Sequence, residues 1–265
     1  MKPRLTVIGA AGRMGRRIVA MASESGQFEI VAAIDRQGHP DMGKDAGFLA
    51  GVATLKVPLT DTCPTDADVA IDFSLPEAID NTLRQCLENS LSLVLGTTGL
   101  NREQRTAVET AAKTIPIVHA TNMSVGMNVL FSLVGKVAAM LGEDYDIEIV
   151  EEHHRLKKDA PSGTALTLAE KICEATKRDF AGCLIHGRSG KDALRQKGTI
   201  GMHAVRAGDI TGIHSVIYGT AGETITLNHT AHSRDMFVRG ALRAALWLAG
   251  RQPGLYAMTD VLGIE

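Results

Sequence analysis

Apolar runs alternate with amphipathic stretches through the N-terminal half of the chain. An apolar run from Leu5 to Ile8 is followed by a glycine-rich turn, by apolar positions at helical spacing from about Met14 to Ser25, and by a second apolar run from Ile30 to Ile34. This order predicts a strand, a crossover helix and a second strand parallel to the first.

The same rhythm continues as far as the middle of the chain. Further strands are predicted at Val69 to Phe73, Leu91 to Leu95 and Ile115 to Val118, with helices at Pro76 to Asn89 and Arg102 to Lys113. Parallel neighbours need crossover connections, and strands buried on both faces form continuous apolar runs. The pattern therefore predicts an α/β fold with a Rossmann-type, doubly wound parallel sheet.

The pattern changes after about residue 124. A helix from Val125 to Leu141 leads into a predicted strand from Asp146 to Val150, which an irregular loop would follow. Beyond a helix that starts near Ser162, short turns separate three more predicted strands, at Met202 to Arg206, His214 to Tyr218 and Glu223 to His229. Short turns favour antiparallel pairing, so we expect a second, α+β domain.

The domain crossings are expected at residues 124 to 126 and 233 to 236, with the two domains meeting at a cleft. A strongly apolar helix from Met236 to Gly250 follows the second crossing and could pack on either domain. The chain shows no internal repeat and no low-complexity linker, which favours short hinges.

Composition excludes several classes of partner. Among 265 residues, 28 basic and 30 acidic side chains leave a net charge of −2, with no basic stretch that could follow a phosphate backbone, so we expect no nucleic acid. No apolar stretch approaches the roughly 20 residues that cross a bilayer, so we expect no membrane insertion. The N-terminus has no secretory pattern, and the cysteines form no C-x-x-C pair, so we expect a cytoplasmic protein with reduced thiols.

A glycine loop lies between the first predicted strand and helix. It reads Gly9-Ala10-Ala11-Gly12-Arg13-Met14-Gly15, a G-x-x-G-x-x-G variant of the dinucleotide-binding spacing. Glycines allow a pyrophosphate to approach the backbone at a helix N-terminus. Asp35 ends the second strand, where a carboxylate can accept from a ribose hydroxyl, and Arg36 could instead pair with a 2′-phosphate. The loop predicts NADH or NADPH without choosing between them.

The run from Glu151 to Thr164 contains the densest candidate chemistry. His153 and His154 can exchange protons near neutral pH, while Arg155, Lys157 and the helix start at Ser162 can hold an anion. Together they indicate an acidic substrate that must also be protonated. No metal site is expected, because the chain lacks zinc-ligand spacings. The remaining histidines are interpreted as packing or surface residues, and they are His39, His119, His186, His203, His214, His229 and His232.

With these motifs in view, the chain resembles the dihydrodipicolinate reductase family, whose members are also called 4-hydroxy-tetrahydrodipicolinate reductases. The resemblance rests on the glycine loop, Gly96-Thr97-Thr98-Gly99, Asn122-Met123-Ser124-Val125-Gly126 and the His-His-Arg-x-Lys run that ends in Ala-Pro-Ser-Gly-Thr. It extends to Ser233-Arg234 and to Ala245-Leu246-Trp247-Leu248, and so covers essentially the whole chain.

The resemblance implies a Rossmann domain over residues 1–124, completed by residues 235–265, and a substrate-binding and oligomerisation domain over residues 125–234. It implies a homotetramer that reduces a cyclic dicarboxylate, 4-hydroxy-tetrahydrodipicolinate, with NADH or NADPH. The product would be tetrahydrodipicolinate, formed with release of water on the route to lysine and diaminopimelate.

The resemblance also implies roles for single residues. The dinucleotide would contact Gly9, Ala10, Ala11, Gly12, Arg13, Met14, Asp35, Arg36, Gly96, Thr97, Thr98, Ala120, Thr121, Asn122 and Met123. The substrate would contact His154, Gly163 and Thr164, with His153 and Lys157 as the proton-handling pair. Two positions near the nicotinamide depart from the family pattern: Met123 replaces the usual Phe, and Ser74 replaces a common Thr.

Two questions and two other functions stay open on the sequence. Our hypothesis is that Lys157 donates the proton and His153 assists, although the pattern alone does not assign the donor. His232 and Arg234 are further candidate contacts. The chain could instead be another two-domain NAD(P)-dependent dehydrogenase, or a sensor that binds NAD(P)H without turnover. A sensor would have no use for His153 and Lys157 beside an anion-binding helix start.

Overall fold

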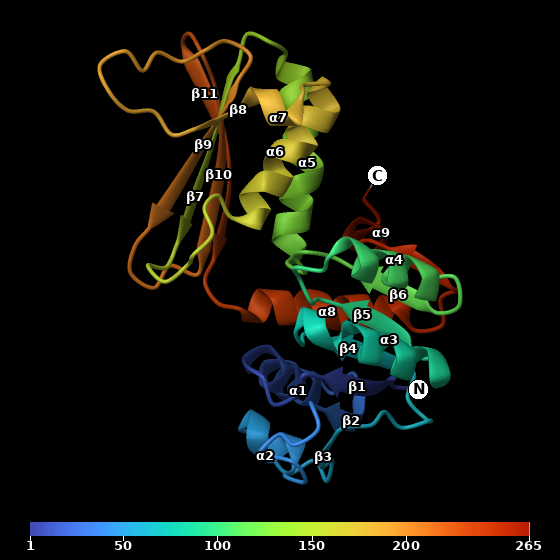
Figure 1. The fold of residues 1–265 in the computed structure, drawn as a ribbon. Coiled ribbons are helices and arrows are strands. Elements are labelled where there is room, and N and C mark those ends of the chain that lie inside the picture. Colours follow the sequence, from blue (N-terminus) through green and yellow to red (C-terminus); the bar gives the residue numbers. More distant parts are fainter. Residues whose placement is uncertain (265) are drawn as a thin grey trace. The chain divides into compact units, whose positions relative to one another are not determined.

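The computed structural model describes residues 1–264, which form two compact units (Figure 1). One unit comprises Met1–Val125 and Asp235–Ile264, and the other comprises Gly126–Arg234. The chain therefore leaves the first unit near the middle of its sequence and returns to it for its last helices.

The first unit is built on a seven-stranded sheet in the order β12-β6-β5-β4-β1-β2-β3, in which every neighbouring pair is parallel. Its strands are β1 (Arg4–Ile8), β2 (Glu29–Ile34), β3 (Leu59–Thr60), β4 (Val69–Asp72), β5 (Ser92–Leu95), β6 (Pro116–His119) and β12 (Gly254–Tyr256). Strand order reverses beside β1, so the carboxyl end of β1 is the switch point where this fold binds ligands. The predicted fold class is confirmed.

Helices cover both faces of this sheet, because the strand side chains that point to either face are apolar. They are α1 (Arg13–Ser25), α2 (Ala46–Ala50), η1 (Pro76–Ala78), α3 (Ile79–Glu88), α4 (Arg102–Ala111), α8 (Asp235–Leu248) and α9 (Met258–Leu262). Val7 and Ile71 face the cluster with α1 and α8, while Ile8 and Ala70 face the cluster with α3 and α4.

The apolar C-terminal helix, α8, packs in the first unit against α1 and the central strands. Val238, Ala241 and Ala245 are fully buried there. A side chain at Gly240 would collide with the backbone carbonyl of Met123, since an added Cβ would lie 1.7 Å from that oxygen. This close approach fixes the segment that precedes α5 (Val125–Leu141) against α8.

The second unit contains a mixed sheet in the order β11-β10-β7-β9-β8. Its strands are β7 (Asp146–His153), β8 (Leu184–His186), β9 (Ile200–Arg206), β10 (Gly212–Thr220) and β11 (Glu223–Ala231). Ile147 and Ile149 of β7 pack against α5 and α6 (Gly163–Thr176), which lie on one face of the sheet (Figure 1). The short helix α7 (Phe180–Cys183) follows α6.

One expectation about the second unit is confirmed and another needs correction. The second sheet is more antiparallel than the first, as predicted, because β10 pairs antiparallel with both β7 and β11, although β9 pairs in parallel with both β7 and β8. Strand β7 does not end at Val150 but continues through His153, where β9 and β10 pair with it on either side. The paired histidines therefore begin on a strand and not on an irregular loop.

Candidate active site

The glycine loop turns sharply at the carboxyl end of β1. Gly9 has φ of +74°, a left-handed conformation that glycine adopts without strain. An added Cβ on Gly15 would lie 2.1 Å from the Gly9 carbonyl oxygen, so helix α1 starts directly against the turn. The Ala10 N–H donates to the Ile34 carbonyl at 2.9 Å and ties the turn to β2.

The N-terminus of α1 has the features of an anion cradle. Gly12 occupies the N-cap position and no side chain caps the helix. Gly12 and Arg13 are exposed, while Arg16 donates from Nε to the Ala11 carbonyl at 2.8 Å and holds the loop from its other side. Uncapped amides and the helix dipole at this end suit a phosphate group.

Asp35 links the end of β2 to the glycine loop. Its carboxylate accepts from the Ala11 N–H at 3.0 Å and from the Arg36 N–H at 2.9 Å. A carboxylate has about four acceptor sites, so it retains capacity for ribose hydroxyls. Arg36 is exposed beside it. The geometry thus keeps both cofactors open.

Two further loops lie at the same edge of the sheet, after β4 and β5. The buried Asp72 carboxylate accepts from the Ser74 N–H at 2.6 Å and from the Thr97 hydroxyl at 3.2 Å, which joins the two loops. Burial raises the pKa of Asp72 above its usual value. The Phe73 ring lies over Gly96, where an added Cβ would be 2.4 Å from the ring. Neither Asp72 nor Phe73 was among the predicted contacts of the dinucleotide.

The segment after β6 supplies the last group of predicted cofactor contacts. Thr98 and Thr121 are exposed, and Ala120 and Asn122 are half-buried. The Asn122 side chain accepts from the Ser124 N–H at 2.9 Å and shapes this turn. Met123 differs from its neighbours, because its side chain is only 1% exposed and packs in the core of the first unit.

In the second unit, the strand extension places Glu151 and His153 on the same buried face of β7. The two side chains meet, with Nδ1 of His153 2.5 Å from Oε2 of Glu151. Burial lowers the pKa of His153, and the hydrogen bond and charge of Glu151 act in the opposite direction. The pair is a histidine held by a carboxylate, an arrangement that orients an imidazole for proton transfer.

Arg206 and Ser162 complete the surroundings of Glu151. Arg206, at the end of β9, donates from both terminal nitrogens to the two carboxylate oxygens at 2.8 and 2.7 Å. The Ser162 N–H donates to Oε1 at 3.0 Å. Burial alone would raise the pKa of Glu151, but these hydrogen bonds and the one with His153 hold it below the usual value.

His214 lies beside His153, a position that the sequence did not predict. It is buried on β10, its ring centroid lies 5.1 Å from that of His153, and Nε2 lies 3.2 Å from the Ser162 hydroxyl oxygen. Burial lowers its pKa to about 3, so its ring is neutral. His214 was interpreted as a packing or surface residue, and it is a buried packing residue whose neighbours are His153 and Ser162. Only strand pairing brings it here.

Lys157 lies on the turn that follows β7. Its ammonium contacts the Asp159 carboxylate at 2.9 Å, and its backbone N–H donates to the His154 carbonyl at 3.1 Å. Its positive charge is near enough to His153 to lower the pKa of that ring. His154 is half-buried, and Arg155 is exposed. Lys157 and His153 are therefore electrostatically coupled.

Helix α6 begins beside this pair, as predicted. Ser162 is its N-cap, and the Ser162 hydroxyl accepts from the Ala165 N–H at 3.2 Å. Gly163 is exposed, and a Cβ added there would meet no atom within 4 Å. Thr164 is half-buried. The first turn of α6 therefore exposes Gly163, and the preceding Ser162 N–H is bound by Glu151, the partner of His153.

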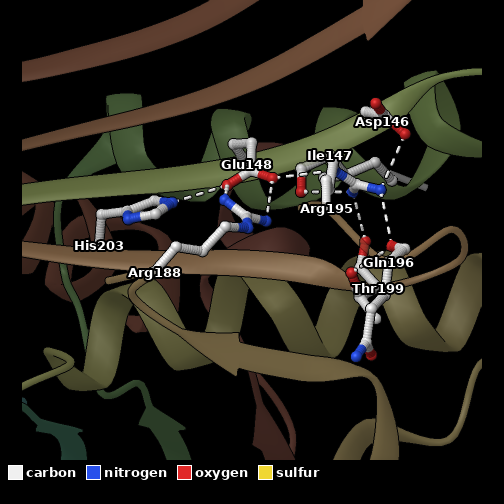
Figure 2. Close-up of polar contacts among 8 residues, drawn as sticks. All are labelled: Asp146, Ile147, Glu148, Arg188, Arg195, Gln196, Thr199 and His203. Carbon is white, nitrogen blue, oxygen red and sulfur yellow. Dashed lines mark hydrogen bonds and ion pairs between the residues drawn. The ribbon is translucent and has the colours of Figure 1, made fainter. Parts of the chain in front are cut away.

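A second polar cluster lies on the opposite face of β7 (Figure 2). Glu148 accepts from both terminal nitrogens of Arg188 at 2.9 and 2.7 Å, from Nε of Arg195 at 3.0 Å, and contacts His203 at 2.6 Å. These partners hold the pKa of Glu148 at about 2 although burial opposes the shift. His203, interpreted above as an isolated residue, belongs to this cluster, which anchors the segment after β8.

Neither cluster forms a metal centre. Among residues 1–264, no group of three or more His, Cys, Asp or Glu side chains could hold a metal ion. Within the same range, no helix has the length and apolar character needed to span a bilayer.

Comparison with known protein families decides the class of this site. A model described as the N-terminus of dihydrodipicolinate reductase matches residues 3–123, and one described as its C-terminus matches residues 126–262. The chain belongs to the dihydrodipicolinate reductase family. The resemblance stated from the motifs is confirmed.

Curated relatives from the same family match this chain over essentially their whole length. The 4-hydroxy-tetrahydrodipicolinate reductase of Alkalilimnicola ehrlichii is 46% identical, with 100% of both chains covered. The one from Geotalea uraniireducens is also 46% identical, with 99% of both covered. A solved dipicolinate-bound dihydrodipicolinate reductase from Paenisporosarcina sp. TG-14 shares the fold, with a TM-score of 0.74, 22% identity and coverage of 98% and 99%.

Membership makes the chain a nicotinamide-dependent oxidoreductase of lysine and diaminopimelate biosynthesis. The alternatives of a different two-domain dehydrogenase and of a non-catalytic sensor are not favoured, because both halves match the same reductase family.

Proposed function

We propose that the chain reduces 4-hydroxy-tetrahydrodipicolinate to tetrahydrodipicolinate with NADH or NADPH and releases water. The observation that carries this proposal is the buried pair of Glu151 and His153, which lies beside Lys157 and the open first turn of α6. A cyclic dicarboxylate needs an anion site and a proton donor together, and this part of the chain supplies both.

The first unit is proposed to bind the dinucleotide. The cradle at Gly9 and Gly12 and the uncapped start of α1 suit the pyrophosphate, and Asp35 with Arg36 suits the adenosine ribose. When bound, the reduced nicotinamide would supply the hydride. The proposed contacts also include Ala10, Ala11, Arg13, Met14, Gly96, Thr97, Thr98, Ala120, Thr121, Asn122 and Met123. For the buried Met123, the backbone is the better candidate for contact.

One substrate carboxylate is proposed to bind at the first turn of α6, through Gly163 and Thr164. Gly163 is exposed, and its N–H belongs to the first turn of the helix, where amides have no intrahelical partner and can donate to a carboxylate oxygen. His154, with Arg155 or Lys157, is proposed to bind the other carboxylate. Both anchors lie within the second unit, close in sequence to the proton-handling pair.

Lys157 is proposed as the immediate proton donor. Its ammonium contacts the exposed Asp159, so it is held close to the site without being buried. Burial lowers the pKa of His153 and Glu151 opposes that shift, and an imidazole held by a carboxylate is suited to proton transfer. We propose that His153 assists Lys157, either by returning the proton or by orienting a carboxylate.

The assembly and location of the protein are part of the same proposal. We propose a cytoplasmic homotetramer in which residues 125–234 bind substrate and form the subunit contacts. All four cysteines are free thiols, with Cys173 Sγ 3.3 Å from Cys183 Sγ, and we propose that they stay reduced. Light scattering of the purified protein tests the assembly, and a monomeric mass would contradict it.

The reaction is tested by adding enzymatically generated 4-hydroxy-tetrahydrodipicolinate to the protein with NADH or NADPH. Loss of the nicotinamide absorbance, dependent on both protein and substrate, is the expected result. If the protein binds the cofactor but the absorbance does not change with either cofactor, the proposal is wrong and a sensing role is favoured.

A further inference from the structure

Glu151 contacts groups from three separate segments of the second unit. Oε2 lies 2.5 Å from His153 Nδ1 on the same strand. Arg206, at the end of β9, contacts both oxygens, and the Ser162 N–H donates to Oε1 at 3.0 Å. The Glu151 side chain is 1% exposed, so solvent does not compete for these contacts.

We propose that Glu151 is a positioning residue for the reaction. One oxygen fixes the proton of His153 on Nδ1, and the other fixes the residue that opens the anion-binding turn. The catalytic part of this inference rests on the proposed function, but the effect of Glu151 on His153 can be measured without turnover.

The charge on Glu151 determines which nitrogen of His153 faces the reaction. An unpaired buried carboxylate would take up a proton, but the paired contact with Arg206 keeps Glu151 ionised. An ionised carboxylate only accepts hydrogen bonds, so Nδ1 must be the donor. The proton that His153 exchanges is therefore carried on Nε2.

The space around Nε2 supports this assignment. A Cβ added at Gly212 would lie 3.2 Å from Nε2 of His153, so a larger residue would press against that nitrogen. Glycine at this position leaves the edge of the ring open. The orientation set by Glu151 and the space left by Gly212 therefore act on the same atom.

The second oxygen of Glu151 links His153 to α6. The Ser162 N–H is held by Oε1, and the Ser162 hydroxyl is held by the Ala165 N–H and by His214. Ser162 is thus restrained through both its backbone and its side chain. The adjacent amide of Gly163 is presented in a fixed direction, at a fixed position relative to the imidazole.

The direct test compares the His153 ring in the wild type with that in Glu151→Gln, by following its NMR signals through a pH titration. Glu151, Arg206, His214 and Lys157 all act on this ring, and only the charge of Glu151 is removed. The pKa of His153 should fall in Glu151→Gln. An unchanged pKa would overturn the proposal.

Glu148→Gln is the matched control. Glu148 lies on the same strand, also contacts arginines and a histidine, and faces the other side of the sheet. It should leave the pKa of His153 unchanged, and an equal fall in both variants would overturn the proposal. If Glu151→Gln does not fold, Glu151→Asp keeps the negative charge but shortens the side chain and weakens its hydrogen bond to His153. A smaller fall in the pKa of His153 is then expected, and its absence overturns the proposal.

A double-mutant cycle separates positioning from simple support of the fold. Glu151→Gln should lower kcat on the order of 100-fold, the range expected when a proton-transfer group loses its orientation. In a His153→Ala background the same change should lower kcat by clearly less than 100-fold, because the part of its effect that passes through His153 is already lost, while the part that passes through Ser162 remains. Full additivity would overturn the proposal. If the wild-type protein does not oxidise the cofactor in the presence of substrate, the proposed function is wrong. The titration of His153 would still decide the role of Glu151.

Discussion

His214 on β10 is the register partner of Glu151 on β7, and this pairing sets the His214 ring edge-on to the His153 ring at 5.1 Å. Burial and the nearby His153 lower the pKa of His214 to about 3. The ring therefore supports the site as a neutral group. It also makes the stability of the protein depend on pH.

The first prediction concerns that dependence. The pKa of His214 is about 3 in the folded protein, below the ordinary histidine value of 6.5, so the unfolded chain takes up the proton first as pH falls. The contribution of neutral His214 to the free energy of unfolding is fully present above about pH 6.5. It is lost as the pH falls from there towards 3, by up to about 1.4 kcal/mol per pH unit. Urea unfolding at pH 6.5 and pH 5 should show a smaller loss for His214→Gln than for the wild type. Equal losses would contradict this assignment.

The second prediction concerns the start of α1. In Gly15→Ala the new Cβ would lie 2.1 Å from the Gly9 carbonyl, a clash with backbone that no side-chain movement relieves. We expect a loss of about 3 kcal/mol or more, together with loss of dinucleotide binding. Gly219→Ala is the control, because its nearest contact, Thr224, lies at 3.7 Å. Thermal unfolding and cofactor fluorescence measure both effects, and a stable Gly15→Ala that binds NADH normally would be inconsistent with the cradle.

The third prediction concerns cofactor choice. Asp35→Ala should raise KM for NADH by roughly 10- to 100-fold, which corresponds to the free energy of a hydrogen bond to a charged group. The rise in KM for NADPH should be smaller. Arg36→Ala should raise KM for NADPH more than KM for NADH, since it removes the cation nearest to a 2′-phosphate. Steady-state kinetics with both cofactors measure the ratios. Identical changes for both cofactors in both variants would show that neither side chain reads the ribose.

The fourth prediction concerns Lys157. Lys157→Ala should lower kcat on the order of 10²–10⁴-fold, because it removes the proposed donor. Lys158→Ala is the control, since Lys158 is its exposed neighbour in the sequence. Both variants should unfold at the wild-type temperature, because the Lys157 ion pair with Asp159 is largely exposed on the carboxylate side. Near-normal turnover by Lys157→Ala would remove it from the mechanism.

The sequence was sufficient to predict the parallel sheet and the helix Val125–Leu141, because buried strands and long helices depend on apolar spacing within a single segment. The cofactor loop was predictable for the same reason, since its glycines and Asp35 belong to one strand-turn-helix-strand unit. The two short edge strands, β3 and β12, were not predicted, because a few residues carry too little apolar pattern to mark a strand.

The environment of His153 was not predictable in the same way. Glu151 and His153 continue the alternation of Ile147 and Ile149, but their polarity hid the end of the strand. Their partners, Arg206 and His214, come from strands far along the chain, and only sheet pairing brings them together. A polar pair at strand spacing after two buried apolar residues is the signal that could have identified them.

Isotope transfer tests the proposed reaction most directly. Wild-type protein is incubated with 4-hydroxy-tetrahydrodipicolinate and NADPH or NADH carrying deuterium at the transferable position of the nicotinamide, and the product is analysed by mass spectrometry. We predict tetrahydrodipicolinate that has lost one water and gained one deuterium. Unlabelled product, or unchanged substrate in the presence of bound cofactor, would contradict the proposed reduction.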